Sequence, residues 1–598
     1  MNMKKSNIFQ SGLLAVASLA IATGCSDWDD HYEANSCESA TSTQTLWNVL
    51  STNQEFSNFA DLVKKVKMDG ALNTEQVYTV WAPKNGSPSF DYNYWSQKDS
   101  ATIMTQFIGN HIARFNHPAT GLLDNSDSVI TTLNEKRMAF ENIGGYRFNG
   151  TKVIQANTPA SNGTLHVLAD ATPFRFNLYE NVDNENYQLD SLKNYLHRYD
   201  TEILDKASSV EGPIVNGQIT YLSSVYFKTN FIYSELNGAY INSEDSSYTM
   251  IYPTNTAWQK AIDAMKDKFK YIPSARFRNL RNNNTQETVE MDAEYLKDSL
   301  PKHSIVANLI YNNNLFSNSI LKKLPNLTVT TNDSALTTMR NIAYGEDITD
   351  MFVGATKAEM SNGIAWITDT LRYKPWLTWN PIIVVEGEDT DYSNDPENRT
   401  GTANTVRVTS TNKNPAIKQD VSGTGYMDVV PASTSAQPII SYYLPNVLST
   451  SYHIFVDFVP ANIRNANITS LKPNRVKFQL TYHTEDGTSK NVTFDNDGNN
   501  FVTDSSCIST VHVGEFTFPI AYRGVVATNG FYPALQIATR VSGKDERAIY
   551  DRELRIDRIY LIPTELIEYV KTHPDYKIGY TKLGTVTHWT FSDILKSI

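Results

Sequence analysis

Two tryptophans in the second half of the chain have the residue type and spacing of a sugar-binding platform. Trp376 and Trp379 lie three positions apart in a stretch bounded by Pro375 and Pro381, which disfavours a continuous helix. Exposed indole rings on such a loop would pack against the CH groups of a pyranose ring. The alternative is that the two rings pack between domains. Trp376 and Trp379 are therefore the candidate ligand-binding residues.

No motif in the sequence indicates catalysis. The patterns His-Glu-x-x-His and Gly-x-Ser-x-Gly are absent, as are a phosphate-binding glycine loop and a dinucleotide fingerprint. A glycosidase needs only two carboxylates roughly 5 to 10 Å apart, and the 64 acidic residues would supply such a pair by chance. We expect a protein without catalytic residues, cofactor or enzymatic activity.

Two oxygen-rich segments are weak candidates for calcium binding. Asp495–Asn499 has suitable spacing but lacks the closing Glu of an EF-hand loop, so an Asp-Gly turn between strands explains it better. Glu386, Glu388, Asp389 and Asp391 could bind calcium at the edge of a domain, although we expect these side chains to be solvated. The prediction is that the chain holds no metal ion.

The N-terminus resembles the leader of a bacterial lipoprotein. Lys4 and Lys5 precede an apolar run over residues 13–22, too short to span a bilayer, which ends in Ala22-Thr23-Gly24-Cys25. This ending resembles a lipobox, which implies a signal peptide over residues 1–24 and a lipidated Cys25. An ordinary secretory signal is the alternative. Each buried CH₂ of the acyl chains adds roughly 0.8 kcal/mol, so the lipid would be a sufficient anchor.

The lipidated cysteine begins an acidic tether over residues 25–43. Its first part, Ser26-Asp27-Trp28-Asp29-Asp30, resembles the surface-export signal of lipoproteins in bacteria that build Sus-type glycan importers, which implies display on the outside of the outer membrane. A merely solvated tether is the alternative. The formal charge of −12 also argues against nucleic acid as a partner. The residues of the export signal are Ser26, Asp27, Asp29 and Asp30.

The pattern after the tether predicts a mixed domain over residues 44–176. Two short amphipathic helices are expected before residue 70, then an apolar strand over 77–82 and an alternating strand over 162–168. The order of these elements resembles the fasciclin domain. Its two motifs stand as Tyr78-Thr79-Val80-Trp81-Ala82-Pro83-Lys84-Asn85 and Asn162-Gly163-Thr164-Leu165-His166-Val167.

The same two motifs recur in a second domain over residues 177–384. The interval from Pro253 to Asn362 is about 30 positions longer than the interval from Pro83 to Asn162, which predicts an insertion near residues 276–298. The repeated motifs are Tyr248-Thr249-Met250-Ile251-Tyr252-Pro253-Thr254-Asn255 and Asn362-Gly363-Ile364-Ala365-Trp366-Ile367.

The resemblance implies a compact α+β wedge and a role in adhesion or in contacts with protein or glycan. Fasciclin domains share no catalytic residues. Some animal members carry a Tyr-His pair linked to adhesion receptors, but this chain has Asn110-His111 and Asn308-Leu309 there. Binding to a specific animal receptor is therefore not carried over. His111 and His166 are expected to be structural histidines.

Short strands separated by turn signals predict an antiparallel β-sandwich over residues 385–566, similar to the jelly rolls used as carbohydrate-binding modules. Residues 567–598 form a tail that the pattern does not assign. The expected strands lie at 439–444, 452–458, 476–482, 491–494, 534–538 and 554–563.

The predicted fold class is therefore α+β, with two tandem fasciclin-like domains followed by a jelly-roll-like β-sandwich. Two functions remain open. The chain could be an accessory lipoprotein of an outer-membrane Sus-type uptake system that binds a polysaccharide or oligosaccharide, with a TonB-dependent transporter and its lid lipoprotein as partners. Alternatively, it could be a structural or adhesive protein that contacts other proteins without binding glycan.

Overall fold

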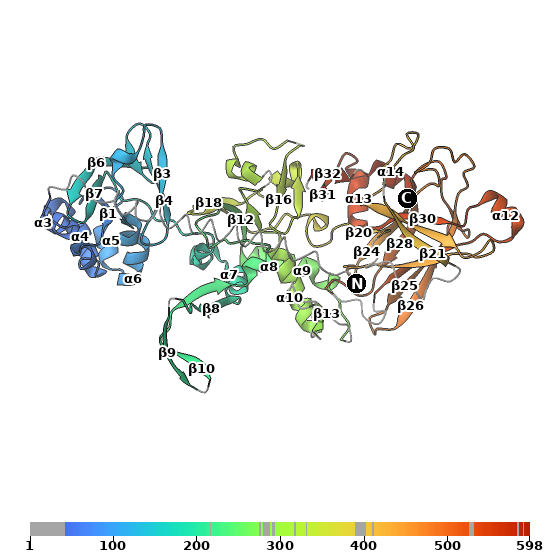
Figure 1. The fold of residues 1–598 in the computed structure, drawn as a ribbon, viewed down its shortest axis with the longest axis horizontal. Helices are drawn as coiled ribbons and strands as arrows, with labels where there is room; N and C mark the ends of the chain where they lie inside the picture. The colour runs from blue at the N-terminus through green and yellow to red at the C-terminus, as the bar shows by residue number, and fades with distance from the viewer. Residues whose placement is uncertain are drawn as a thin grey trace, which may run out of the picture. The chain divides into compact units, whose positions relative to one another are not determined.

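The computed structural model describes residues 42–598 apart from short gaps. The described chain divides into two compact units (Figure 1). The first unit holds the residues up to Asn177 together with Asn242–Asp245 and Glu359–Asn362, and the second unit holds the rest. Between these gaps, no helix is both long and apolar enough to cross a membrane. The gaps are 208, 216, 274–276, 279–287, 290–292, 316–317, 331, 389–401, 410–411, 525–531, 583–584 and 590.

Short helices pack along one side of the sheet in the first unit (Figure 1). Helix α3 (Leu46–Thr52) begins after Thr45, whose side chain caps it by accepting a backbone hydrogen bond. Helix α4 (Ser57–Lys65) buries one apolar face in the core, as the sequence predicts, through Phe59, Leu62 and Val63. The remaining helices are α5 (Tyr92–Ser96) and α6 (Ser100–Ile103).

The sheet of the first unit has seven strands in the order β2-β1-β7-β6-β5-β4-β3. Strands β1 (Tyr78–Pro83) and β7 (Gly163–Leu168) pair in parallel and carry the two predicted motifs, and together with β2 they form the three-stranded centre of the repeat. Gly163 has a φ of +144°, and a Cβ there would lie 1.8 Å from the carbonyl oxygen of Tyr78. Glycine is needed because the two backbones approach so closely. The other strands are β2 (Ile112–Arg114), β3 (Asp127–Thr131), β4 (Arg137–Asn142), β5 (Tyr146–Phe148) and β6 (Thr151–Ala160).

The second unit contains the same strand arrangement. Strand β12 (Tyr248–Pro253) pairs in parallel with β19 (Gly363–Thr368) and antiparallel with β15 (Ile310–Asn312). A Cβ on Gly363 would lie 1.9 Å from the carbonyl oxygen of Tyr248. The two motif pairs therefore build the same three-stranded centre twice. Around the second centre lie α7 (Asp190–His197), α8 (Ile232–Glu235), α9 (Asn255–Met265), α10 (Ala293–Val306), α11 (Glu346–Asp350), β13 (Phe277–Arg278), β14 (Thr288–Val289), β16 (Ser334–Leu336), β17 (Ile342–Tyr344) and β18 (Thr356–Met360).

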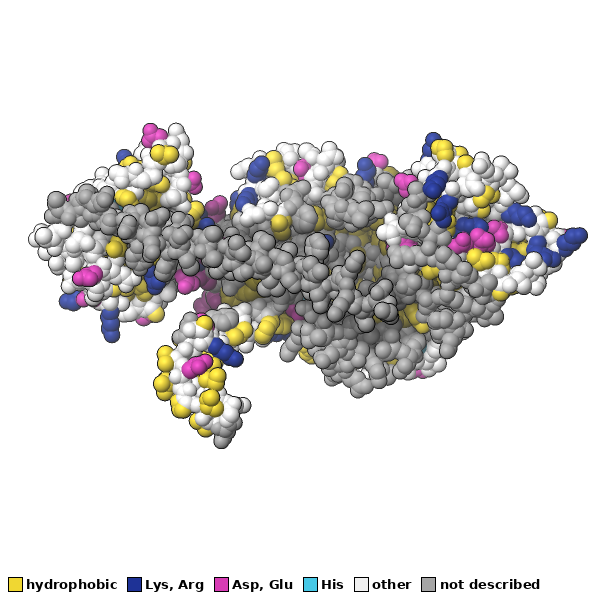
Figure 2. All heavy atoms as spheres, in the orientation of Figure 1, with side chains coloured by type: hydrophobic (Ala, Val, Ile, Leu, Met, Phe, Trp, Pro, Cys, Tyr) yellow, Lys and Arg dark blue, Asp and Glu magenta, His cyan; other side chains and the backbone are white. Residues whose placement is uncertain are grey.

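A long ribbon distinguishes the second repeat from the first. Thirteen positions separate the end of α4 from β1, whereas 51 separate the end of α7 from β12. No sequence pattern indicates this ribbon, and most of the insertion predicted at 276–298 lies outside the described residues. The ribbon extends away from the rest of its unit (Figure 1), and hydrophobic side chains line it (Figure 2). It consists of β8 (Asp200–Leu204) paired with β11 (Tyr226–Asn230), then β9 (Val210–Val215) paired with β10 (Gln218–Ser223).

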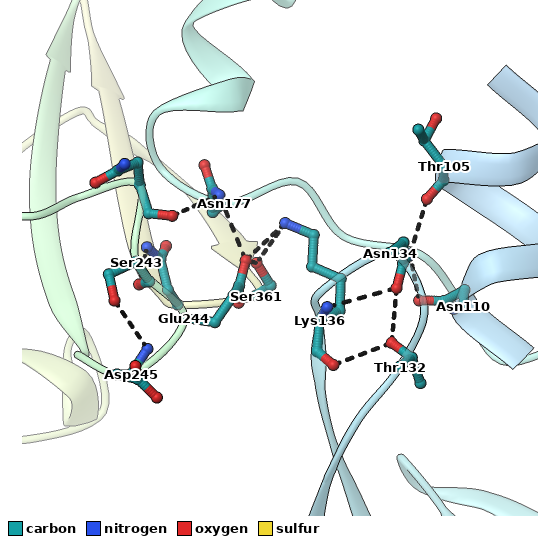
Figure 3. Close-up of polar contacts among 12 residues, drawn as sticks. Thr105, Asn110, Thr132, Asn134, Lys136, Asn177, Ser243, Glu244, Asp245 and Ser361 are labelled. Atoms are coloured by element: carbon teal, nitrogen blue, oxygen red, sulfur yellow. Dashed lines mark hydrogen bonds and ion pairs between the residues drawn. The ribbon is translucent and has the colours of Figure 1, made fainter. Parts of the chain in front are cut away.

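A buried ion pair lies within the first unit (Figure 3). Lys136 Nζ lies 2.6 Å from Glu244 Oε1, and the two side chains are only 4% and 11% exposed. Ser361 Oγ donates to the same oxygen at 2.9 Å, and Asn177 Nδ2 at 3.4 Å. Removing one charge from such a pair leaves the other buried and unpaired, which costs about 3–5 kcal/mol. The segments 242–245 and 359–362 are thus fastened to the turn between β3 and β4.

Two antiparallel sheets form a sandwich in the second unit. The first sheet has the order β21-β22-β30-β24-β28, with β20 also on β30, and the second has the order β23-β29-β25-β26, with β27 also on β25. In β23, β25 and β29, side chains at alternate positions are buried in the space between the sheets. The strands are β20 (Ile383–Glu386), β21 (Thr402–Thr409), β22 (Gly425–Pro431), β23 (Ile439–Tyr443), β24 (Ser451–Phe458), β25 (Arg475–His483), β26 (Ser489–Phe494), β27 (Phe501–Val502), β28 (Ser509–Thr517), β29 (Ala534–Thr539) and β30 (Leu554–Pro563), and helix α12 (Gly543–Ile549) precedes β30.

The C-terminal segment, which the sequence leaves unassigned, folds onto the first sheet of the sandwich. Its apolar side chains form one cluster with Phe455 of β24 and Tyr560 of β30, so the segment covers one face of that sheet. It consists of α13 (Thr564–Thr572), β31 (Ile578–Lys582), β32 (Thr585–Trp589) and α14 (Ser592–Ser597).

Candidate ligand-binding face

The predicted anchor and export residues lie outside the part of the chain that the structure describes. They are Cys25, Ser26, Asp27, Asp29 and Asp30. Lipidation and surface export therefore stay predictions from the sequence.

The two candidate tryptophans do not form an exposed pair. Trp376 is 7% exposed, and its Nε1–H donates to the hydroxyl of Tyr576 at 3.0 Å. Its ring lies 5.1 Å from that of Tyr569, at a tilted angle. Trp379 is half-buried, and its carbonyl oxygen accepts from Arg523 Nη1 at 2.6 Å. For Trp376 the packing interpretation fits the geometry, because both the ring and its N–H contact the C-terminal segment.

Three polar side chains, those of Asp347, Lys374 and Tyr576, lie beside Trp376 and contact one another. Asp347 accepts a hydrogen bond from Tyr576 at 2.8 Å and forms an ion pair with Lys374. Burial raises the pKa of Asp347, while the hydrogen bond and charge of Lys374 oppose the shift. These groups join the second repeat to the C-terminal segment, and the Trp376 ring is buried beside them.

Trp379 instead lines a pocket between α9 and α10. Its walls include Met265, Ile305 and Tyr373, and its volume is about 150 Å³. Ligand pockets generally have volumes of about 300–1,000 Å³. The pocket is therefore smaller than a typical ligand pocket.

The outward face of the second sheet of the sandwich carries a regular pattern of neutral polar side chains. In β25, Val476, Phe478 and Leu480 are fully buried. Gln479 and Thr481 alternate with them and are partly exposed, so they point away from the core. The register then places four polar side chains side by side across four strands, in the order Ser441, Gln536, Gln479 and Thr493.

A second row runs beside the first, with Tyr443, Ala534, Thr481 and Asn491 opposite one another. Because neighbouring strands lie about 4.8 Å apart, each row spans about 14 Å. Amides and hydroxyls both donate and accept hydrogen bonds. Their arrangement suits a ligand with many hydroxyl groups.

An aromatic edge and a low charge complete this face. The ring of Tyr443 lies 6.0 Å from that of Tyr532 at the end of the sheet. Neither row contains an acidic or basic side chain, and Lys477 stands in the next row, opposite Ala538. A tyrosine beside neutral hydrogen-bonding groups can pack against one face of a sugar ring. The face therefore favours a neutral carbohydrate over a charged one.

Three carboxylates at the other sheet, those of Glu386, Glu388 and Asp557, meet at the loop that precedes β22. The backbone N–H of Ser422 donates to Asp557 at 2.9 Å, and its hydroxyl donates to Glu386 at 3.0 Å. The backbone N–H of Thr424 donates to Glu388 at 2.9 Å. Burial, together with nearby carboxylates that include Glu386, raises the pKa of Asp557 to about 8. Near neutral pH a proton on Asp557 reduces the repulsion among these groups.

The structure corrects the expectation that the acidic residues after β20 are solvated. Glu388 is only 2% exposed, because the chain folds back against the loop before β22. Asp389 and Asp391 lie outside the described residues. Among those that are described, no group of three or more His, Cys, Asp or Glu side chains is arranged to hold a metal ion. Asp495–Asn499 forms a turn, in which Gly498 N–H donates to Asp495 at 2.7 Å.

The strands that meet at Gly163 lie in a segment that matches a known family. Residues 54–171 match the model of the fasciclin domain family. A fasciclin domain pair from the insect cell adhesion molecule fasciclin I is similar in structure, with 12% identity, a TM-score of 0.17, and coverage of 55% of this chain and 97% of that one. No curated protein sequence matches the chain.

Part of the chain is similar in structure to carbohydrate-binding modules. The xylan-binding CBM22-1 domain of Paenibacillus barcinonensis Xyn10C shows 10% identity and a TM-score of 0.18, covering 30% of this chain and 92% of that one. A family 35 module from Clostridium thermocellum shows 12% identity and a TM-score of 0.16, covering 30% and 98%.

The polar rows outside the fasciclin domain are the site residues that the sequence analysis misses. Alternation within residues 476–482 predicts that Gln479 and Thr481 share one side of a strand. The sequence gives no signal that β25 lies between β29 and β26, because these strands are far apart along the chain. The rows exist only through that pairing.

Proposed function

We propose that this chain is a non-catalytic, glycan-binding lipoprotein of the cell surface, and an accessory protein of a Sus-type outer-membrane uptake system. The observation that carries glycan binding is the pair of neutral polar rows on β23, β29, β25 and β26, with Tyr443 at their edge. Anchoring and surface display are supported by the lipobox-like sequence ending at Cys25 and by the acidic residues after it. The ligand class is a neutral polysaccharide or oligosaccharide.

The experiment is affinity electrophoresis of the full-length protein, in mild detergent, through gels that contain neutral polysaccharides. Gln479→Ala combined with Gln536→Ala should abolish retardation, because both amides stand in the middle of the first row. Gln54→Ala removes an exposed amide from the first unit and should leave the retardation unchanged. Equal retardation of the row variant and the wild type would move glycan binding to another surface.

A second candidate function, protein–protein contact, is favoured by a different observation. The ribbon formed by β8–β11 exposes apolar side chains on a surface that is separate from the polar rows.

A further inference from the structure

The outer part of the ribbon exposes an unusual number of large apolar side chains. Ile214 and Ile219 are cross-strand neighbours and are 71% and 49% exposed. Leu222 is 75% exposed. Over the 14 residues from Val210 to Ser223, Glu211 is the only Asp, Glu, Lys or Arg. Several large apolar side chains exposed on so short an element indicate an interaction site rather than ordinary solvent-facing surface.

The ribbon is also incomplete as a folded element. Strands β9 and β10 pair only with each other among the described strands, so both outer edges are open. A two-stranded hairpin in water is marginally stable at best, and open edges accept further pairing. Burying one apolar face against another body would supply the missing stabilisation.

We propose that the β9–β10 ribbon is a docking arm that inserts into an apolar, uncharged groove of a different protein. The side chains of Ile214 and Ile219 enter the groove, and one open strand edge adds to the sheet of the partner. This arm is separate from the polar rows, so the proposal stands or falls independently of glycan binding.

The chemistry of the ribbon disfavours two other occupants. A lipid bilayer would leave open strand edges unpaired in hydrocarbon, where no water can satisfy them. A second copy of this chain, pairing edge to edge, would leave both faces of the ribbon and their apolar side chains exposed. We therefore place the groove on another protein.

Photocrosslinking in the native membrane tests the arm directly. A photoreactive phenylalanine analogue is placed at Leu222 of the full-length chain, and at Val502, an apolar residue of the sandwich that is 49% exposed, as the matched control. We expect one discrete adduct with a different protein from Leu222 and none from Val502. An adduct with twice the mass of the chain, an adduct with lipid, or no adduct would overturn the proposal.

Purified components then separate docking from chance proximity. The partner protein identified by crosslinking, once purified without a crosslink, should slow backbone hydrogen exchange in β9 and β10 of the full-length chain when the two are mixed. Ile214→Thr with Ile219→Thr, which keeps strand propensity but removes apolar surface, should weaken its binding at least tenfold. Unchanged affinity or unchanged exchange would contradict the proposal.

A variant without the outer ribbon tests whether a loss of partner binding comes from the ribbon itself rather than from misfolding of the whole chain. Asp205 N–H donates to the carbonyl oxygen of Val225 at 2.8 Å, so the two chains are adjacent where the outer ribbon begins. Replacing Lys206–Ser224 with Asn-Gly, a two-residue turn suited to hairpins, should preserve the β8–β11 stem and the thermal unfolding of the body. The same variant should no longer bind the partner. Retained binding would place the contact elsewhere.

Discussion

His111 and His166 have the structural roles expected from the sequence. Both are buried, and burial lowers the pKa of each to about 4. His111 Nε2 accepts from the backbone N–H of Thr172 at 2.9 Å, and its Nδ1 lies 2.8 Å from the carbonyl oxygen of Phe107. Each ring is held neutral inside the first unit and has no surface left for a ligand.

Asp557 predicts that the stability of the sandwich falls as pH rises. Its pKa rises from an unfolded value near 4 to about 8, so the folded state keeps its proton over a wider range than the unfolded state. This stabilisation is complete below pH 4 and is lost as pH rises towards 8. Between pH 5 and pH 7 the free energy of unfolding of the sandwich should fall by about 2–3 kcal/mol from this group.

Asp557→Asn, which keeps an acceptor for Ser422 N–H, should flatten that slope in denaturant unfolding of the full-length protein. The curves are recorded with a chelator and with added calcium. If the wild type shows no slope, or if calcium alone removes it, the carboxylates are balanced by something other than a proton.

Elements with a local signal could be predicted, and elements defined by distant pairing could not. The strands β1 and β12 follow from apolar runs that end at Pro83 and Pro253, and the amphipathic face of α4 follows from its spacing. The ribbon was missed because its short alternating strands pack against no core and resemble a loop. The polar rows were missed because they depend on which strands of the sandwich are neighbours.

The close approach of β1 and β7 gives a prediction at the scale of the element. Gly163→Ala would push a Cβ to within 1.8 Å of the carbonyl oxygen of Tyr78 and should destabilise the first unit by about 3 kcal/mol or more. Gly86→Ala, in the same unit, has a φ of +77° but meets no atom within 4 Å, so it should cost only about 1–2 kcal/mol. Denaturant unfolding measures the free energy of unfolding of both variants. Equal losses of stability would show that the close approach of β1 and β7 does not require glycine at position 163.

For the whole molecule, the C-terminal segment explains why one face of the sandwich is closed and another remains available. Residues of α13, β31 and α14 cover the first sheet together with Trp376, so that sheet has a packing role. The polar rows lie on the second sheet, whose outward side chains stay partly exposed. The sequence predicted the sandwich but not which of its two sheets is covered. The pattern of residues 567–598 did not indicate which surface they pack against.

The central claim is that a neutral glycan binds on the outward face of the second sheet. Hydrogen exchange of the full-length protein, measured by mass spectrometry with and without a polysaccharide that retards it in a gel, tests this most directly. The account predicts slower exchange in peptides covering β23, β25 and β29, with no change around Trp376 and Trp379. Protection confined to residues 370–380 or to a fasciclin-like domain would contradict it, and would place the binding site there instead.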